Sequence, residues 1–135
     1  MKKTLLLAAA TGLMLTACAS HHREMHVGKA DPLRTGVSVV DGKHIVVDQE
    51  PIYFSKGTQN VRFKWQLPSD SKYTFPKDGV VIKDADTEIV ECHPEQGGLA
   101  FSCLNKHAKP GRYKYTIKLE GSPAVPPLDP IIVND

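Results

Sequence analysis

Every second side chain is apolar in the stretch Val61-Arg62-Phe63-Lys64-Trp65-Gln66-Leu67. The same alternation returns in Tyr113-Lys114-Tyr115-Thr116-Ile117-Lys118-Leu119. Successive side chains of a β-strand point to opposite faces, so a period of two indicates a strand with one buried and one solvated face. Both stretches therefore predict strands that cover a hydrophobic core.

Seven further apolar runs predict short strands. They are Val37–Val40, Ile45–Val47, Ile52–Phe54, Val80–Ile82, Glu88–Cys92, Leu99–Cys103 and Ile131–Val133. Turn signals such as Asp41-Gly42 and Lys109-Pro110-Gly111 separate these runs, and no helical period interrupts them. Short strands at this spacing predict an all-β fold, a single antiparallel Greek-key β-sandwich.

Residues 1–18 resemble the signal peptide of bacterial lipoproteins. Two lysines precede the apolar stretch Leu5–Leu15, and Leu15-Thr16-Ala17-Cys18 is similar to the lipobox of that family. As a helix this stretch would be about 16 Å long, too short for a hydrocarbon core of about 30 Å. The resemblance implies cleavage before Cys18, lipidation of its thiol and amine, and a water-soluble domain anchored to the membrane. Ala19-Ser20, in place of an Asp after the cysteine, favours an outer-membrane lipoprotein facing the periplasm or the exterior.

The chain is thereby divided into a signal peptide (1–17), a lipidated cysteine with a flexible tether (18–35) and a β-sandwich domain (36–135). For the tether residues His21, His22 and His26, a solvated linker and a weak metal site both remain open. Cleavage removes Lys2 and Lys3 from the 17 basic residues of the 135-residue chain, which leaves 15 against 15 acidic ones. A mature chain with no net charge predicts no nucleic-acid partner, and the length leaves no room for a two-domain enzyme.

Two resemblances concern the sandwich. Residues 51–57 followed by 61–65 are similar to the opening strands of cupredoxins, and Phe101-Ser102-Cys103, His107 and residues 111–115 resemble their copper loop. Pro110-Gly111-Arg112-Tyr113 is also similar to the turn that begins strand F of immunoglobulin-like domains, with Ile131–Val133 as strand G. Both families are Greek-key sandwiches, so cupredoxin-like and immunoglobulin-like topologies remain open.

The cysteines have two competing uses. If Cys18 is lipidated, Cys92 and Cys103 are an even pair in an oxidising compartment, which predicts a disulfide. The cupredoxin resemblance implies instead a copper site, for which His93, Cys103 and His107 are the candidates. The family's second histidine and axial methionine are missing from their expected positions. We therefore predict the disulfide and no cofactor, with periplasmic copper handling as the alternative.

The function indicated is binding or envelope structure. No hydrolase, kinase, nucleotide-loop or zinc-protease motif occurs, which predicts that the chain is not an enzyme. If the two best strands are neighbours, their outward cations form one surface for an anionic glycan or protein partner, although ordinary solubilising charge also explains them. These cations are Arg62, Lys64, Arg112, Lys114 and Lys118. The segments Pro68–Lys77 and Cys92–Cys103 are the expected contact loops. A further alternative is an accessory lipoprotein or inhibitor that acts on an envelope protein.

Overall fold

The computed structural model of the chain describes residues 30–135, which form nine strands and one short 3-10 helix. The lipobox, Cys18 and the tether histidines lie outside the described residues. The elements are β1 (Arg34–Val40), β2 (His44–Val47), β3 (Ile52–Phe54), β4 (Val61–Gln66), β5 (Val80–Ile82), β6 (Ile89–Glu95), η1 (Gln96–Gly98), β7 (Ala100–Asn105), β8 (Gly111–Ile117) and β9 (Ile131–Asn134). All nine predicted strands are present.

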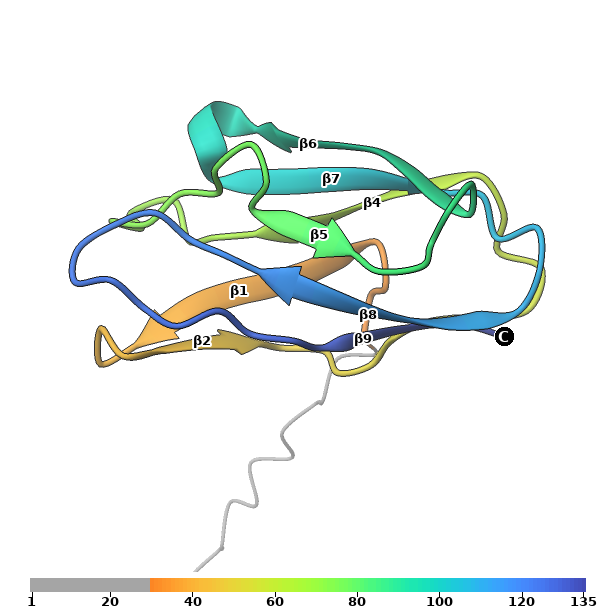
Figure 1. Cartoon of the computed structure of the whole chain (residues 1–135), viewed down its shortest axis with the longest axis horizontal. Coiled ribbons are helices and arrows are strands. Elements are labelled where there is room, and N and C mark those ends of the chain that lie inside the picture. The colour runs from red at the N-terminus through yellow and green to blue at the C-terminus, as the bar shows by residue number, and fades with distance from the viewer. Residues whose placement is uncertain (1–29) are drawn as a thin grey trace, which may run out of the picture.

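The strands form two sheets, which confirms the predicted β-sandwich (Figure 1). One sheet has five strands in the order β2-β1-β4-β7-β6, and the other has four in the order β3-β9-β8-β5. Most neighbours are antiparallel, but β1 is parallel to β4 and β3 is parallel to β9, so both sheets are mixed. The chain leaves the five-stranded sheet after Val47 and enters the other at Ile52, and this change of sheet places β3 beside the last strand.

The connectivity bears on the immunoglobulin-like resemblance. In immunoglobulin domains the strand that carries the core tryptophan shares a sheet with strand F. Here Trp65 lies on β4 and Tyr113 lies on β8, in opposite sheets. Trp65 therefore does not occupy the position of the immunoglobulin core tryptophan, although β8 pairs with β9 as the predicted strands F and G would.

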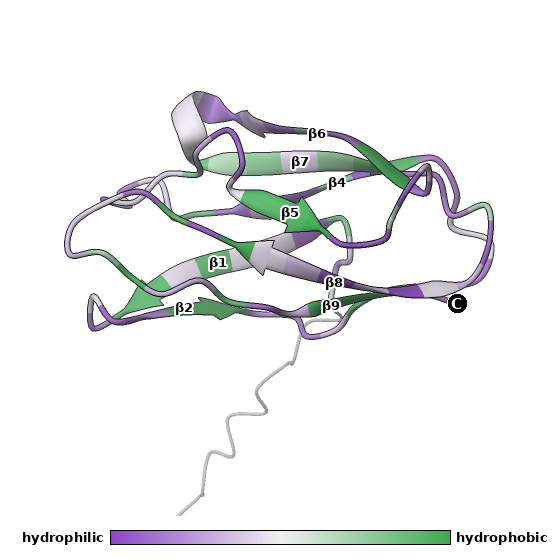
Figure 2. Cartoon of the chain, viewed as in Figure 1, coloured by the Kyte–Doolittle hydropathy of each residue, from purple (hydrophilic) through white to green (hydrophobic). Residues whose placement is uncertain are grey.

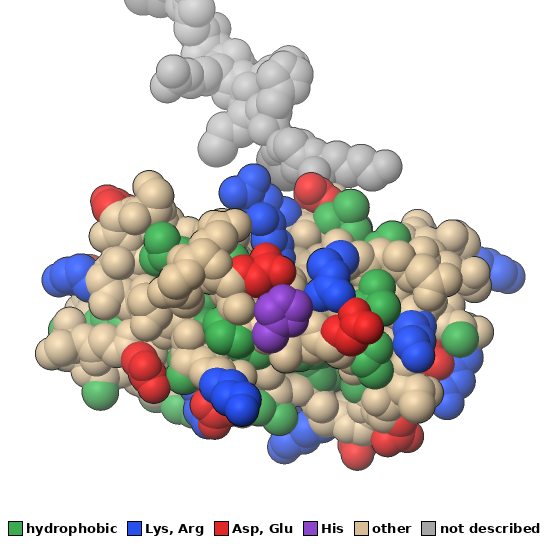
Figure 3. Space-filling model, turned by 90° about the horizontal axis from the view of Figure 1, so that it is seen from above, with side chains coloured by type: hydrophobic (Ala, Val, Ile, Leu, Met, Phe, Trp, Pro, Cys, Tyr) green, Lys and Arg blue, Asp and Glu red, His purple; other side chains and the backbone are tan. Residues whose placement is uncertain are grey.

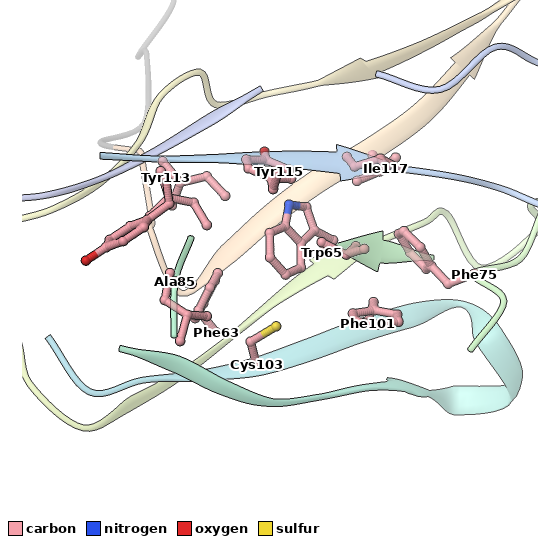
Figure 4. Close-up of a cluster of buried hydrophobic side chains, with 14 of the residues drawn as sticks. Phe63, Trp65, Phe75, Ala85, Phe101, Cys103, Tyr113, Tyr115 and Ile117 are labelled. Carbon is pink, nitrogen blue, oxygen red and sulfur yellow. The ribbon is translucent and has the colours of Figure 1, made fainter. Parts of the chain in front are cut away.

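The core lies between the sheets and is centred on Trp65, which is fully buried. Its ring centroid is 5.0 Å from that of Phe63 on the same strand and 5.1 Å from that of Tyr115 on β8. Figure 4 shows Trp65 and Tyr115 meeting across the two layers, with Phe101 of β7 on the other side of the indole. Burial of each such ring contributes about 1.5–3 kcal/mol, so the alternating pattern of β4 and β8 accounts for much of the driving force.

The predicted disulfide between Cys92 and Cys103 is present and joins β6 to its neighbour β7. The pairing of these strands shifts between Val90 and His93, so two residues of β6 oppose Cys103 in a β-bulge. Glu91, the first residue of the bulge, has a φ of +53°. The bulge turns the side chains of β6 that follow it, and it is the feature that positions the polar residues described next.

Candidate functional site

The five cations predicted to share one surface lie on opposite sheets, so that prediction is wrong. Arg62 and Lys64 point outward from β4, whereas Arg112 and Lys114 point outward from β8, with Lys118 just beyond its end. The prediction required β4 to lie beside β8. Instead β4 pairs with β1 and β7, and β8 pairs with β5 and β9.

The copper site on His93, Cys103 and His107 is contradicted as well. The sulfur of Cys103 is bonded to Cys92 and is not available as a thiolate ligand. His93 is exposed on the edge strand β6, while His107 is buried at the far end of β7. Among residues 30–135 no three side chains of metal-binding type come together.

His107 belongs instead to a buried polar cluster at one end of the sandwich. Its ring nitrogens Nδ1 and Nε2 lie 2.7 Å from the main-chain oxygen of Thr58 and 2.9 Å from that of Asp135. Its main-chain N–H donates to Asn105 Oδ1, and the side-chain amides of Asn105 and Asn134 donate to each other at 2.8 and 3.0 Å. These bonds join β7, β9 and the loop before β4, which indicates a structural role.

A polar network covers the outer face of β6 and β7. Ser102 Oγ donates to Glu95 Oε1 at 2.7 Å, and His93 Nε2 lies 3.3 Å from the same carboxylate oxygen. Beside them Arg62 Nη2 lies 2.5 Å from Glu91 Oε2, so the guanidinium of β4 reaches across β7 to the bulge of β6. Figure 3 looks onto the side of the molecule formed by β6, where a histidine lies among acidic and basic side chains.

The order of groups in this network argues against nucleophilic catalysis. In a serine triad the histidine lies between the serine and the carboxylate and accepts the serine proton. Here the carboxylate of Glu95 lies in the middle, and Ser102 is only 1% exposed. The network can hold Arg62 and His93 in fixed positions beside a cavity of about 230 Å³, which is lined by Leu33, Arg62, Phe63, Lys64, Glu95 and Ser102.

A larger groove opens on the same sheet where β1 and β4 separate. The two strands pair only from Arg34 to Gly36, and beyond Gly36 strand β1 pairs with β2 alone. In Figure 1 the ends of β1 and β4 diverge from this point. The space beside them has a volume of about 760 Å³ and is open to solvent. It is lined by β1, by β2, by the Leu67-Pro68-Ser69 turn after β4, and by Gln96 and Leu99.

The lining of the groove is apolar at its floor and polar at its rim. Val37, Leu67 and neighbouring aliphatic side chains form the floor, and Val46 is 39% exposed beside it. At the rim Asp48 Oδ1 accepts a bond from the main-chain N–H of Gly36 at 2.8 Å, which holds its carboxylate over β1. Gln66 spans toward η1 and donates to the main-chain oxygen of Leu99 at 3.0 Å. Such a lining suits a mixed apolar and polar ligand.

Two ionisable groups with shifted pKa values lie away from the groove and the polar network. Burial raises the pKa of Tyr115 to about 12, an effect that the nearby Trp65 indole partly offsets. The ammonium of Lys118 hydrogen-bonds to Asp78 and lowers the pKa of that carboxyl. Tyr115 lies in the core, and Asp78 precedes β5 in the other sheet, so both shifts reflect the scaffold.

Part of the groove and of the polar network on β6 and β7 was predicted from the sequence. The segment predicted to contact partners from Cys92 to Cys103 contains Glu95, Gln96 and Leu99, and the segment from Pro68 contributes the start of the turn. Ser102 also lies in the segment from Cys92 to Cys103 but was not singled out, and the unpaired end of β1 was missed. An available signal was the outward position of Ser102, between the inward Phe101 and Cys103, where a small polar residue leaves room for a side chain from β4.

Within residues 30–135 no helix has the length and apolar character needed to cross a bilayer. Comparison with known proteins adds no assignment, since the chain matches no protein-family model and no curated protein sequence.

Proposed function

We propose that the chain is a non-catalytic, lipid-anchored binding module of the cell envelope, and that the groove beside β1 binds an extended segment of a protein partner. The anchor would be Cys18, in an outer-membrane lipoprotein. This function is that of an accessory lipoprotein or an inhibitor, because both require a fixed surface and no chemistry.

The observation that carries the proposal is the unpaired side of β1 inside a groove. Residues Val37–Val40 have a strand partner on one side only among the described residues. The free main-chain groups of such an edge are a template for a further strand, and flanking pockets for alternate side chains provide specificity. The groove supplies apolar floor and polar rim along this edge.

The anchor is supported by the order of residues in the first eighteen positions. A basic start, an apolar run too short to span a bilayer and a small-residue cleavage site ending in Cys18 occur in sequence. About a dozen residues then separate Cys18 from the first described residue, and a loose chain of that length spans about 20 Å. The sandwich would therefore stay close to the membrane.

The groove can be tested by photo-crosslinking in cells, with a photoreactive residue at Ser69 of the groove. We expect one discrete partner, and Ser38→Lys, which places a charged side chain in the groove, should abolish the crosslink. Thr116→Lys is the matched control, since Thr116 is equally half-buried and points outward from the opposite sheet. A crosslink that survives Ser38→Lys, or that Thr116→Lys removes equally, would refute the groove as the binding site.

The anchor is tested separately by metabolic labelling with a fatty acid. We expect label in the wild-type chain and none in Cys18→Ser, which should also appear in the soluble fraction. A wild-type chain without label would refute the anchor and leave the groove experiment unaffected.

A further inference from the structure

The outer face of the four-stranded sheet combines cations with exposed apolar side chains. Across one row of the sheet, Arg112 of β8 pairs with Val133 of β9, and Val133 pairs with Tyr53 of β3. In the next row Lys114 pairs with Ile131. Figure 2 shows the hydrophobic strands β5 and β9 on either side of β8.

Two side chains at the margins of this face are unusually exposed for their type. Tyr53 on the edge strand β3 is 48% exposed, and Val81 on the opposite edge strand β5 is 45% exposed. A phenol ring and a valine in these positions form an apolar rim on both sides of the cations. We name the β8 face by six residues, Tyr53, Val81, Arg112, Lys114, Ile131 and Val133.

The positive charge of the β8 face is only partly offset by the carboxylates around it. Of three carboxylates at its margin, that of Asp78 forms an ion pair with Lys118. Asp129 Oδ1 accepts a hydrogen bond from the neutral hydroxyl of Thr116 at 2.6 Å, and Asp135 Oδ2 accepts one from that of Tyr53 at 2.7 Å. These carboxylates still contribute negative charge at its margin.

Arg112 and Lys114, in contrast, form no ion pair with any residue from 30 to 135. Lys83 joins them, because its main-chain N–H donates to Lys114 O at the end of β5. Arg112 and Lys114 on the β8 face, with Lys83 at its edge, are therefore cations without direct ion-pair partners among the described residues.

We propose that the β8 face lies against the anionic lipid headgroups of the membrane that holds the anchor. Cations attract such a surface, while a tyrosine and aliphatic side chains are favourable at the boundary between headgroups and acyl chains. The charge of the β8 face and that of the headgroups are complementary. The inference rests on the proposed lipid anchor, since a flexible tether from Cys18 would hold the domain at an average distance of about 20 Å from the headgroups.

The expected effect follows from the number of cations. Each lysine or arginine near an anionic leaflet favours contact about fivefold. Lys118 offsets Asp78, so the three cations Arg112, Lys114 and Lys83 act against the two carboxylates of Asp129 and Asp135. The net of one cation should favour this orientation about fivefold. The preference should fall at high salt, since these charges are exposed.

The test uses the full lipidated chain in vesicles, with a fluorophore on a single introduced cysteine and a quencher carried by the lipid. Val81→Cys places the probe on the β8 face, and Val46→Cys places it on the groove face, at a residue that is similarly exposed (39%). In vesicles that contain phosphatidylglycerol we expect several-fold stronger quenching at position 81. In phosphatidylcholine alone, or at high salt, the two positions should become similar.

Two charge variants make the test specific. Arg112→Gln with Lys114→Gln should abolish the difference between the probes, whereas Lys43→Gln with Lys72→Gln, the same loss of charge on exposed residues outside the β8 face, should preserve it. Equal quenching at both probes, or a difference that survives loss of Arg112 and Lys114, would overturn the inference while leaving the anchor intact. A chain that fails to float with vesicles of either composition would overturn the anchor and this orientation together.

Discussion

Opening the disulfide between Cys92 and Cys103 should destabilise the domain by about 3 kcal/mol without unfolding it. The two residues are 11 positions apart, so the bond closes a loop of about twelve residues in the unfolded chain. In the chain-entropy description, closing such a loop contributes about 3 kcal/mol to stability. For a domain of about 100 residues this corresponds to a fall in Tm on the order of 10–20 °C.

The two sulfurs differ in their surroundings. The effect of losing the cross-link can therefore be measured separately from the effect of losing a packed sulfur. Cys92 is exposed on the bulge, whereas Cys103 is fully buried in the core cluster with Phe63 and Ile89. Cys92→Ala removes the cross-link alone and should therefore match the reduced wild-type protein. Adding Cys103→Ala also removes a buried sulfur, and we expect a further loss of about 1 kcal/mol.

Urea unfolding followed by Trp65 fluorescence provides the measurement, for the oxidised and reduced wild type and for both variants. The indole is fully buried in the folded domain, so its emission should change strongly on unfolding. A reduced protein within about 1 kcal/mol of the oxidised one, at an unchanged m-value, would contradict the loop-closure reasoning. A Cys92→Ala variant much less stable than the reduced wild type would show that the mutation disturbs more than the cross-link.

Three further outcomes are expected. The pKa of Tyr115 is about 12 in the folded state and about 10 in the unfolded chain, because burial disfavours the phenolate. The contribution of the neutral phenol to the free energy of unfolding is therefore complete below about pH 10 and declines as the pH rises toward 12. When urea unfolding is measured across that pH range, the free energy of unfolding of Tyr115→Phe should decline less steeply with pH than that of the wild type. At neutral pH the two free energies should differ by less than about 1 kcal/mol, and parallel pH dependences would contradict this reasoning. His107→Ala leaves the main-chain oxygens of Thr58 and Asp135 without their partner and should cost about 2–4 kcal/mol in the same assay, so a loss below about 1 kcal/mol would show that the cluster is not structural. Arg62→Met removes the ion pair with Glu91, in which the two side chains are 44% and 60% exposed, so the free energy of unfolding should change by less than about 1 kcal/mol. A larger change would show that the pair is more than a surface contact.

The strands could be predicted because their signal is local. Alternation along β4 and β8 assigned Phe63, Trp65, Tyr113 and Tyr115 to the core, and all four are buried. The disulfide could be predicted in the same way, because two cysteines on strands joined by a Gly-rich turn meet in an antiparallel pair. In each case the information lies within one strand or one hairpin.

The pairing of distant strands could not be predicted in the same way. Whether β4 lies beside β7 or β8 depends on where the chain changes sheet, which it does between β3 and β4 and again between β7 and β8. The alternating pattern is the same in both arrangements. The predicted surface of five cations failed for this reason. The groove could not be predicted for a related reason, because it exists only where β1 and β4 separate after Gly36.

The division of the cations between two sheets has a functional consequence under both proposals. Arg112 and Lys114 point away from the core on one side of the sandwich, and the groove beside β1 opens on the other sheet. If the β8 face rests on the headgroups, the unpaired side of Val37–Val40 is turned away from the membrane and is accessible to an extended segment of a partner. A single surface of five cations on the five-stranded sheet would have directed the groove toward the lipid. The strand order that contradicted the predicted cation surface is therefore the same feature that, under the two proposals, would place the membrane contact and the protein contact on opposite sides of one small domain.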